Sequence, residues 1–133
     1  SFLRKMGLKE YSRLAHEHLK MNPQKIKKEF EEALTNRRRK IFFVDDGKIR
    51  AYIIGTLLKN QYQCLGYIDD VYVEEDSRGK GFGKELIRVF TKWALSRKAT
   101  KIRLGVRVNN TKAIRLYKKI GFRIKHYEME KEI

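Results

Sequence analysis

The residues that decide the fold are 67–122, with the sequence YIDDVYVEEDSRGKGFGKELIRVFTKWALSRKATKIRLGVRVNNTKAIRLYKKIGF. Three glycines, at positions 79, 81 and 83, separate a strand-like segment from one whose apolar residues recur at helical spacing. That helix is expected to end near Arg97, and its apolar positions are Leu86, Ile87, Phe90, Trp93 and Ala94. The stretch therefore predicts a strand, a glycine-rich turn and an amphipathic helix in succession.

Downstream of this helix, the pattern predicts another strand and another helix. Residues 101–108 alternate apolar side chains with lysine and arginine, which is typical of a strand with one buried face. Residues 110–120 have helical spacing, and Gly121 follows at the position where a helix often ends in a left-handed conformation. Residues 122–133 are expected to close the chain as a strand or a strand pair.

Upstream of residue 67, the pattern predicts a short strand at residues 2–5 and then two helices. Helical spacing in the first of these helices connects Tyr11, Leu14, Ala15, His18 and Leu19. His16 and His18 are two residues apart, so they are expected to point in different directions, at the surface or at its boundary with the core. Asn22 is expected to cap the second helix, with Pro23 in its first turn. The expected buried stripe of that helix is Ile26, Phe30, Ala33 and Leu34.

Three strands are expected before the glycine-rich turn, at residues 40–44, 49–59 and 64–74. Asp46-Gly47 between the first two is a strong signal for a hairpin turn. An antiparallel front half followed by strand, helix, strand, helix and strand indicates an α/β protein with a mixed sheet and helices on both faces. Because no linker interrupts the 133 residues, residues 1–133 are expected to form a single domain.

The composition favours anionic ligands or partners. Lysine and arginine number 32 against 16 acidic residues, which gives a net charge of +16. Such a charge suits a phosphorylated cofactor, RNA or an acidic peptide, although solubility or adaptation to heat would also produce it. Residues 45–76 are the exception, because acidic residues outnumber basic ones there.

Several other classes of protein are disfavoured. Cys64 is the only cysteine, so no internal disulfide forms, and no Cys/His spacing offers a metal site. We expect Cys64 to be a buried structural residue. No apolar run of about 18 residues is present, so we expect no membrane association and a cytoplasmic location. The sequence leaves a homodimer open.

The glycine-rich turn is expected to bind a pyrophosphate. Glycines between a strand and a helix allow several backbone N–H groups to converge near the positive end of the helix dipole. A Walker loop requires Ser or Thr after Lys84, but Glu85 follows it. A dinucleotide fingerprint requires a third glycine where Lys84 stands, and an acid at the end of the next strand, where Arg107 stands. Both nucleotide loops are therefore excluded.

The remaining pattern, Arg78-x-x-Gly81-x-Gly83, resembles the acyl-CoA loop of the GNAT superfamily of N-acetyltransferases. A second run, Asn110-x-x-Ala113-x-x-Leu116-Tyr117-x-x-Ile120-Gly121-Phe122, resembles the superfamily at the expected distance downstream. The resemblance implies a mostly antiparallel sheet with a central, splayed pair of parallel strands, and acetyl-CoA as co-substrate. It implies that acetyl-CoA is bound by Val71, Val73, Arg78, Gly79, Lys80, Gly81, Gly83, Lys84, Asn110 and Tyr117.

The resemblance also implies catalytic roles. Tyr117 is the expected general acid toward the CoA sulfur, with a core aromatic as the alternative, and Asn110 is an expected ligand residue or only a helix cap. Asp69 is favoured as the base, acting through water, because the run Tyr67-Ile68-Asp69-Asp70 resembles polyamine-type and other small-amine acetyltransferases. Asp70 or a water molecule is the other candidate base, since Tyr67 stands where other members of the superfamily have a glutamate. The alternative is an acid paired with a lysine. Strand alternation predicts that Asp69 and Asp70 point to opposite faces.

The amine acceptor stays open between a small polyamine-like amine, a lysine-bearing peptide and a protein N-terminus. The acidic middle segment suggests that a cationic acceptor approaches one side, while CoA phosphates meet Lys80, Lys84 and Lys112 on the other. The alternative from another class is a basic module that binds nucleic acid or the ribosome without catalysis. The net charge and the run Arg37-Arg38-Arg39-Lys40 suggest it, but no RNP-type or KH-type element accompanies them.

Overall fold

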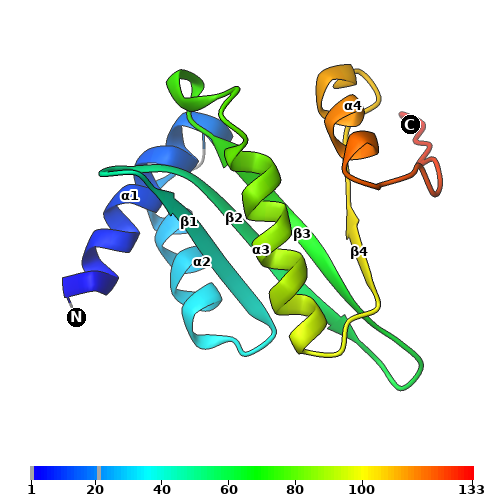
Figure 1. Ribbon diagram of the computed structural model, residues 1–133, viewed down its shortest axis with the longest axis horizontal. Coiled ribbons are helices and arrows are strands. Elements are labelled where there is room, and N and C mark those ends of the chain that lie inside the picture. Colours follow the sequence, from blue (N-terminus) through cyan, green and yellow to red (C-terminus); the bar gives the residue numbers. More distant parts are fainter. Residues whose placement is uncertain (1, 21) are drawn as a thin grey trace.

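The computed structural model describes residues 2–20 and 22–133, and places four strands and four α-helices in them (Figure 1). The elements in chain order are α1 (Phe2–Leu19), α2 (Pro23–Thr35), β1 (Arg39–Asp45), β2 (Ile49–Lys59), β3 (Cys64–Val73), the 3-10 turn η1 (Glu75–Ser77), α3 (Phe82–Ser96), β4 (Lys101–Leu104) and α4 (Thr111–Lys119).

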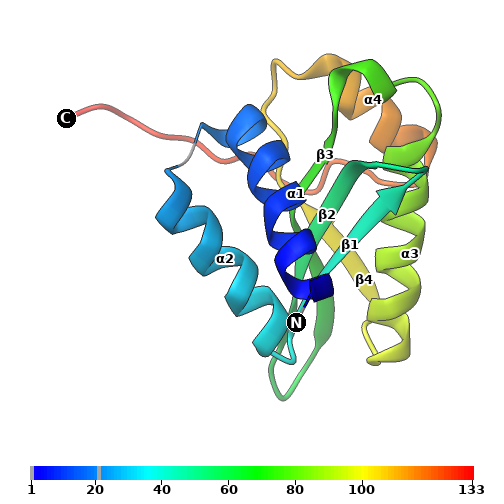
Figure 2. The ribbon, with the colours of Figure 1, turned by 90° about the vertical axis from the view of Figure 1, so that its left-hand side faces the viewer.

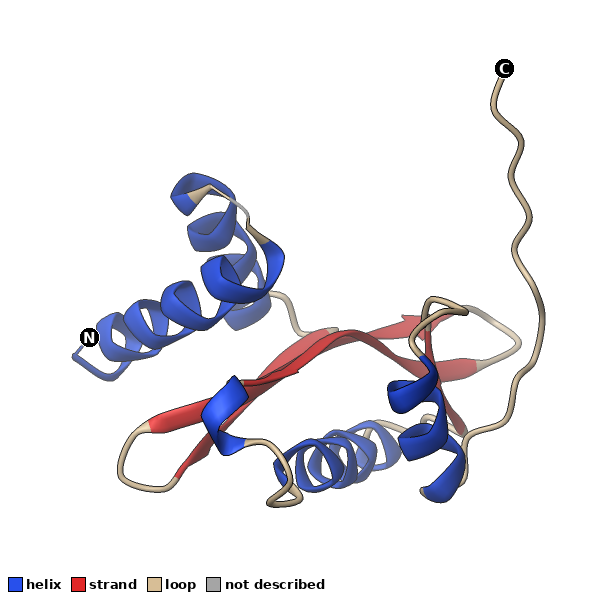
Figure 3. Ribbon diagram, turned by 90° about the horizontal axis from the view of Figure 1, so that it is seen from above, coloured by secondary structure: helices blue, strands red, loops and turns tan. Residues whose placement is uncertain are grey.

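The four strands form one mixed sheet in the order β1-β2-β3-β4. β1 with β2 and β2 with β3 are antiparallel pairs, whereas β3 and β4 run parallel. Helices α1 and α2 cover one face of the sheet, and α3 covers the other (Figures 2 and 3). The predicted class, a mixed sheet with helices on both faces, is therefore confirmed.

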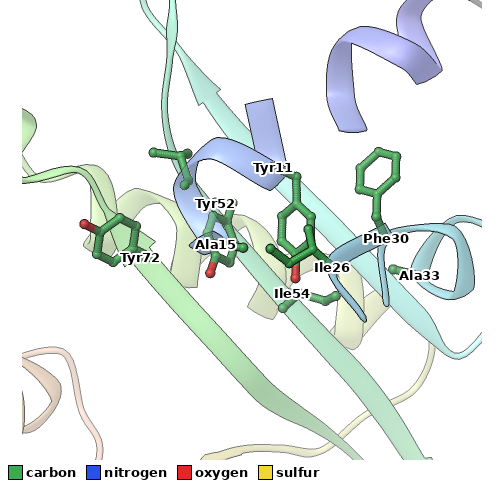
Figure 4. Packing of buried hydrophobic residues seen from close by; sticks show 9 residues of the cluster. Tyr11, Ala15, Ile26, Phe30, Ala33, Tyr52, Ile54 and Tyr72 are labelled. Atoms are coloured by element: carbon green, nitrogen blue, oxygen red, sulfur yellow. The ribbon is translucent and has the colours of Figure 1, made fainter. Parts of the chain in front are cut away.

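The core between the sheet and α1–α2 is built around aromatic rings that pack against one another (Figure 4). Tyr11 on α1 packs with Phe30 on α2 at a ring-centroid distance of 5.6 Å and with Tyr52 on β2 at 5.0 Å. Tyr52 lies 6.2 Å from Tyr72 on β3, so the aromatic contacts reach the strand that leads to the glycine-rich turn. These contacts fix α1 against β3, because interior side chains pack at crystal-like density.

On the opposite face of the sheet, α3 packs very close to the strands. A Cβ on Gly55 would lie 2.3 Å from the ring of Phe90, and a Cβ on Gly66 would lie 3.0 Å from Ala94 Cβ. Phe90 and Ala94 are both fully buried. The two glycines therefore allow α3 to approach β2 and β3 closely.

Two of the predicted turn features are confirmed. The side chain of Asn22 accepts a hydrogen bond from Lys25 N at 2.9 Å and so caps α2, with Pro23 as the first helical residue. Gly47 has a φ of 104°, which is the conformation that the hairpin turn between β1 and β2 requires. Cys64 is buried, as expected of a structural cysteine.

Four local expectations are wrong. Residues 2–5 belong to α1, because residues 3–6 are good helix formers and continue the helix. β4 ends at Leu104, since Gly105 follows it and a glycine weakens a strand. Residues 122–133 form no strand and extend away from the fold (Figure 3), because β4 offers an edge of only four residues. Leu34 is 42% exposed rather than part of the buried stripe of α2.

Among the described residues, no helix combines the length and the apolar character that crossing a membrane would require.

Candidate active site

The two parallel strands separate before β3 ends. Pairing between β3 and β4 runs from Leu65↔Lys101 to Ile68↔Leu104 and stops there. β3 continues to Val73, paired only with β2 on its other edge. Beyond Ile68, the backbone N–H and C=O groups on the β4 side of β3 have no strand to pair with and are available to a ligand. The splayed pair of parallel strands predicted from the sequence is therefore present.

A register shift in the pairing of β2 with β3 brings Asp69 and Asp70 to the same face of the sheet. Ile54 pairs with Asp70, and the next residue along β2 pairs with Ile68, so Asp69 is the extra residue of a β-bulge. Ile68 and Val71 both pack in the cluster beneath α3, which leaves the two aspartates on the α1–α2 face. The expectation that they point to opposite faces is wrong, because the bulge interrupts the alternation.

The carboxylate of Asp69 is held by two donors. The hydroxyl of Thr56 donates to Asp69 Oδ2 at 2.6 Å, and Arg39 Nη2 lies 3.4 Å from the same oxygen. Arg39 also pairs with Glu29 of α2 at 3.2 Å, so Asp69 belongs to a network that extends to α2. The Asp69 side chain is 30% exposed and therefore remains open to water.

Asp70 connects α1 to the sheet through His18, a residue expected at the surface or at its boundary with the core. His18 Nε2 lies 3.0 Å from Asp70 Oδ1, and the hydroxyl of Tyr52 donates to Asp70 Oδ2. The His18 ring also stacks on Tyr72, with centroids 4.4 Å apart. Burial and the charge of Asp70 raise the pKa of Tyr52, so its hydroxyl stays protonated and remains a donor. His18 lies two helical turns after the buried Tyr11, so both residues are on the face of α1 that packs on the sheet. This spacing is the sequence feature that could have indicated the contact of His18 with the sheet.

A cleft of about 740 Å³ opens where β3 and β4 separate. Of the residues predicted for the site, Asp69, Val71, Asn110 and Tyr117 line this cleft together. His18 and Asp70 line it too, as does the segment between β4 and α4, residues 105–107. This volume lies within the range of about 300–1,000 Å³ that is usual for small-molecule sites.

Tyr117 is half-buried in the cleft wall. Its ring packs edge-on against Phe122 at a centroid distance of 5.8 Å and borders the apolar cluster beneath α3. Burial, together with the charge of Asp70, raises the pKa of the Tyr117 phenol. The phenol is therefore protonated at neutral pH and is able to donate a proton or a hydrogen bond into the cleft.

Asn110 is the N-terminal cap of α4. Its side-chain oxygen accepts a hydrogen bond from Ala113 N at 3.2 Å and so caps α4. An amide oxygen used in this way leaves the NH₂ group for another acceptor. The predicted contact of Asn110 with a ligand is therefore compatible with its capping role and stays a prediction.

The glycine-rich turn has the backbone conformation predicted for it. Gly79 and Gly81 have φ values of 82° and 83°, and a Cβ on either would meet nothing within 4 Å. The first intrahelical hydrogen bond of α3 runs from Glu85 N to Gly81 O at 3.0 Å. The N–H groups of residues 82–84 come before that bond and so have no acceptor within the helix. They point out of its N-terminal end, where they can donate hydrogen bonds to an anion.

The remaining predicted residues lie around this turn and divide into two kinds. Lys80 and Lys84 are exposed beside the turn, where they would add positive charge. Arg78 folds back instead, because its Nε donates to Val73 O at 3.0 Å and its guanidinium lies over the ring of Tyr72 at 5.5 Å. The Val73 side chain packs near Gly83, whose added Cβ would lie 3.8 Å from it. Val73 and Arg78 therefore support the turn and are not among the residues that line the cleft, and their predicted contacts with acetyl-CoA stay predictions.

Comparison with known protein families shows which family the chain belongs to. The sequence model of the acetyltransferase (GNAT) family matches residues 8–122. The chain belongs to this family. The match extends across both helices of the α1–α2 face as well as the splayed strands, the glycine-rich turn and α4.

Individual relatives match over shorter stretches. A streptothricin acetyltransferase from Escherichia coli is 42% identical over 65 residues, which are 49% of this chain and 37% of that protein. A thialysine N-epsilon-acetyltransferase from Sus scrofa is 39% identical over 57 residues, 43% of this chain and 34% of that protein. The aligned parts thus span little more than a third of each of these relatives.

The fold is similar to that of AAC(6')-Iy solved in complex with the bisubstrate analogue CoA-S-monomethyl-acetylneamine. The TM-score is 0.86, and the similarity covers 97% of this chain and 92% of that one. The sequences are only 14% identical, so the comparison shows that this chain has the GNAT fold.

The described residues suit acetyl-CoA as co-substrate. A pyrophosphate requires convergent N–H donors with space in front of them, and the open, left-handed Gly79 and Gly81 provide both. A pantetheine arm requires unpaired backbone groups beside a cleft, and β3 beyond Ile68 provides them. Val71 lines the cleft, and Val73, two residues later on β3, lies beside Gly83 of the turn, so the cleft and the turn are both at the C-terminal end of β3.

Proposed function

We propose that this chain transfers the acetyl group of acetyl-CoA to an amine by direct attack in a ternary complex. The observation that supports this most is the cleft at the splayed strands, which gathers Tyr117 and two aspartates beside a glycine-rich anion cradle. The chemistry needs one group that accepts a proton from the amine, one that donates a proton to the departing thiolate, and donors for the developing oxyanion. The cleft offers a candidate for each.

Bound acetyl-CoA supplies an acyl group that is already activated as a thioester. In the proposed reaction, the amine nitrogen forms a bond to the acetyl carbon, and the bond from that carbon to sulfur breaks. Negative charge develops on the acetyl oxygen during this exchange. We assign its stabilisation to backbone N–H groups of β3 near Val71, which lies beyond the last residue paired with β4.

Asp69 is the proposed proton acceptor. An amine of the lysine type is almost fully protonated at neutral pH, so a proton must leave before its nitrogen attacks. Asp69 lies in the cleft, is 30% exposed and is oriented by Thr56 and Arg39. Exposure lets a water molecule carry the proton between the amine and the carboxylate. Asp70 on the same face adds a second negative charge that attracts the ammonium.

Tyr117 is the proposed proton donor to the CoA sulfur. Its raised pKa keeps the phenol protonated at neutral pH, as a general acid requires. The proton that the sulfur gains balances one of the two that the ammonium nitrogen loses on becoming an amide. The other reaches solvent through Asp69.

The proposed acceptor is a cationic amine. Two carboxylates on one face of the cleft favour an ammonium over a neutral or anionic substrate, which suits both a small polyamine-like amine and a peptide amine. The streptothricin and thialysine acetyltransferases among the relatives carry names of amine substrates, which is consistent with this class.

A panel of acceptors tests the proposal. Polyamines, aminoglycosides, lysine peptides and N-terminal peptides are each incubated with the protein and acetyl-CoA, and free CoA is measured as thiol. We expect at least one class of cationic amine to give saturable thiol release above the rate without acceptor. No release with any class, together with no gain in thermal stability on adding acetyl-CoA, contradicts the proposal, and salt-sensitive binding of RNA would then favour a non-catalytic module.

A further inference from the structure

A second pocket lies at the opposite end of α3 from the glycine-rich turn. It has a volume of about 390 Å³ and is formed by the ends of α2 and α3 and the start of β1. Figure 1 shows the C-terminal ends of both helices at the same end of the sheet. α3 has 15 residues, which corresponds to about 22 Å, so a ligand held here is separate from a pyrophosphate at the turn.

The lining of this pocket is strongly cationic and contains no carboxylate. Its charged residues are Arg37, Arg39, Lys40 and Arg97. Arg39 is neutralised by its ion pairs with Glu29 at 3.2 Å and Asp69 at 3.4 Å. Within the part of the chain that the structure describes, Arg37, Lys40 and Arg97 have no ion pair. Three positively charged residues therefore line the pocket without an ion pair, and the Lys40 ammonium lies 5.6 Å from the ring centroid of Phe42.

The two helix ends account for only part of this charge. α2 ends at Thr35 and α3 at Ser96, and each C-terminus carries a partial charge of about −0.5. Cations gather at such ends to offset the helix dipoles. Three unpaired cations against about one negative charge in total still leave a clear positive excess, so the pocket favours an anion.

The pocket also offers donors and an aromatic wall. The Arg97 guanidinium lies over the ring of Trp93 at 5.7 Å, which orients it at the pocket wall. Asn36 uses its side-chain oxygen to accept a hydrogen bond from Arg38 N at 2.9 Å, so its NH₂ group is left to donate to a ligand.

We propose that this pocket binds the phosphate group of a small molecule. Arginine presents two parallel N–H donors that match a phosphate, and the pocket combines Arg37 and Lys40 from one segment of the chain with Arg97 from another. Because these cations line one concavity instead of following a groove, a compact phosphate suits the site better than a nucleic-acid backbone. The proposal does not rest on the proposed acetyl transfer, although Arg39 both lines this pocket and contacts Asp69.

The fluorescence of Trp93 provides a local readout, because it is the only tryptophan in the chain and lines the pocket. The protein is titrated with inorganic phosphate, with AMP and with a single-stranded RNA oligomer, at constant ionic strength set with chloride. We expect a saturable change with phosphate. Arg37→Gln with Lys40→Gln should raise the apparent Kd at least tenfold, and circular dichroism verifies that this variant is folded. Lys118→Gln with Lys119→Gln removes the same charge from an exposed stretch of α4 that lines neither pocket, and should leave the titration unchanged.

The arms of the experiment separate the sources of the phosphate. Tighter binding of AMP than of inorganic phosphate supports the site and indicates a nucleoside phosphate, whereas equal binding supports it and indicates the phosphate group alone. No saturable change in the unaltered protein overturns the proposal. Equal weakening in both double variants overturns it as well, because net charge would then explain the binding. RNA binding more than tenfold tighter than AMP contradicts it in favour of a nucleic-acid surface.

Discussion

Asp69 and Asp70 are neighbours in β3 and lie on the same face of the sheet, because Asp69 is the extra residue of a β-bulge. Their partners differ. Asp69 is held by Thr56 and Arg39 at an exposed position, whereas Asp70 is 17% exposed and held by Tyr52 and His18. The bulge therefore gives one cleft two carboxylates with different surroundings, and the two are expected to respond differently to substitution.

Asp69→Asn should lower the rate of CoA release at neutral pH by about 10²-fold or more while leaving stability nearly unchanged. Asp70→Asn should instead lower the free energy of unfolding by about 1–3 kcal/mol, because it disturbs a part-buried carboxylate that Tyr52 and His18 contact. Rates and urea denaturation of both variants are compared with those of Asp76→Asn, an exposed control. If Asp70→Asn lost more rate than Asp69→Asn at unchanged stability, the His18–Asp70 pair would be the base instead of Asp69.

Tyr117→Phe should reduce kcat by about 10²–10⁴-fold, because the thiolate would leave without its proton donor. The Michaelis constant for acetyl-CoA should change little, since the ring and its packing on Phe122 remain. Tyr62→Phe is the matched control, because Tyr62 is 86% exposed in a loop. An unchanged kcat in Tyr117→Phe would show that the phenol is not the acid.

Gly81→Ala should weaken acetyl-CoA binding. Gly81 has a φ of 83°, where an alanine costs about 1–2 kcal/mol, so the turn would relax away from the conformation that directs its N–H groups. We expect the Michaelis constant for acetyl-CoA to rise about tenfold. Gly83→Ala is the control, because Gly83 lacks a positive φ and its added Cβ would meet nothing closer than Val73 Cγ2 at 3.8 Å. Equal effects of the two substitutions would refute the role of backbone conformation.

Glu74 should make stability depend on pH in the acid range. Hydrogen bonds from Arg13 at 2.8 Å and Arg50 at 2.9 Å lower the pKa of this buried carboxyl from 4.5 to about 2. A lowered folded-state pKa stabilises the fold above the unfolded pKa, and that stabilisation is lost as the pH falls from about 4.5 to about 2.

At pH 7 we expect Glu74→Gln to lower the free energy of unfolding by about 3 kcal/mol. The difference from the unaltered protein should shrink as the pH approaches 2. Urea denaturation across this range measures it, with the exposed Glu75→Gln as control. A pH-independent difference would mean that the ion pairs with Arg13 and Arg50 do not set the stability.

Features that depend on short-range sequence were predictable. The left-handed glycines of the turn, the cap at Asn110 and the helix that carries Tyr117 each follow from a few adjacent residues. The Tyr117 phenol and the Asp69 carboxylate could be named in advance because their motifs fix their spacing along the chain, whereas Asp70 was expected on the opposite face. Their roles in catalysis stay predictions.

Features that depend on long-range contacts were not predictable from patterns. The bulge at Asp69 arises from the register of β2 against β3, which alternation alone does not reveal. His18 reaches Asp70 only because the aromatic core holds α1 against β3. The cationic pocket combines residues from α2, β1 and α3, so no single segment of the sequence indicates it. Residues 122–133 show strand-like composition without a strand, because little of β4 is free to pair with them.

The most direct test of the central claim is to measure thiol and acetylated amine together in one reaction, by thiol titration and mass spectrometry. We predict that the protein, acetyl-CoA and a cationic amine yield the two products in equal amounts, and that Tyr117→Phe lowers both together. Release of thiol without acetylated amine, or equal yields in the absence of the protein, would contradict the assignment of acetyl transfer to this cleft.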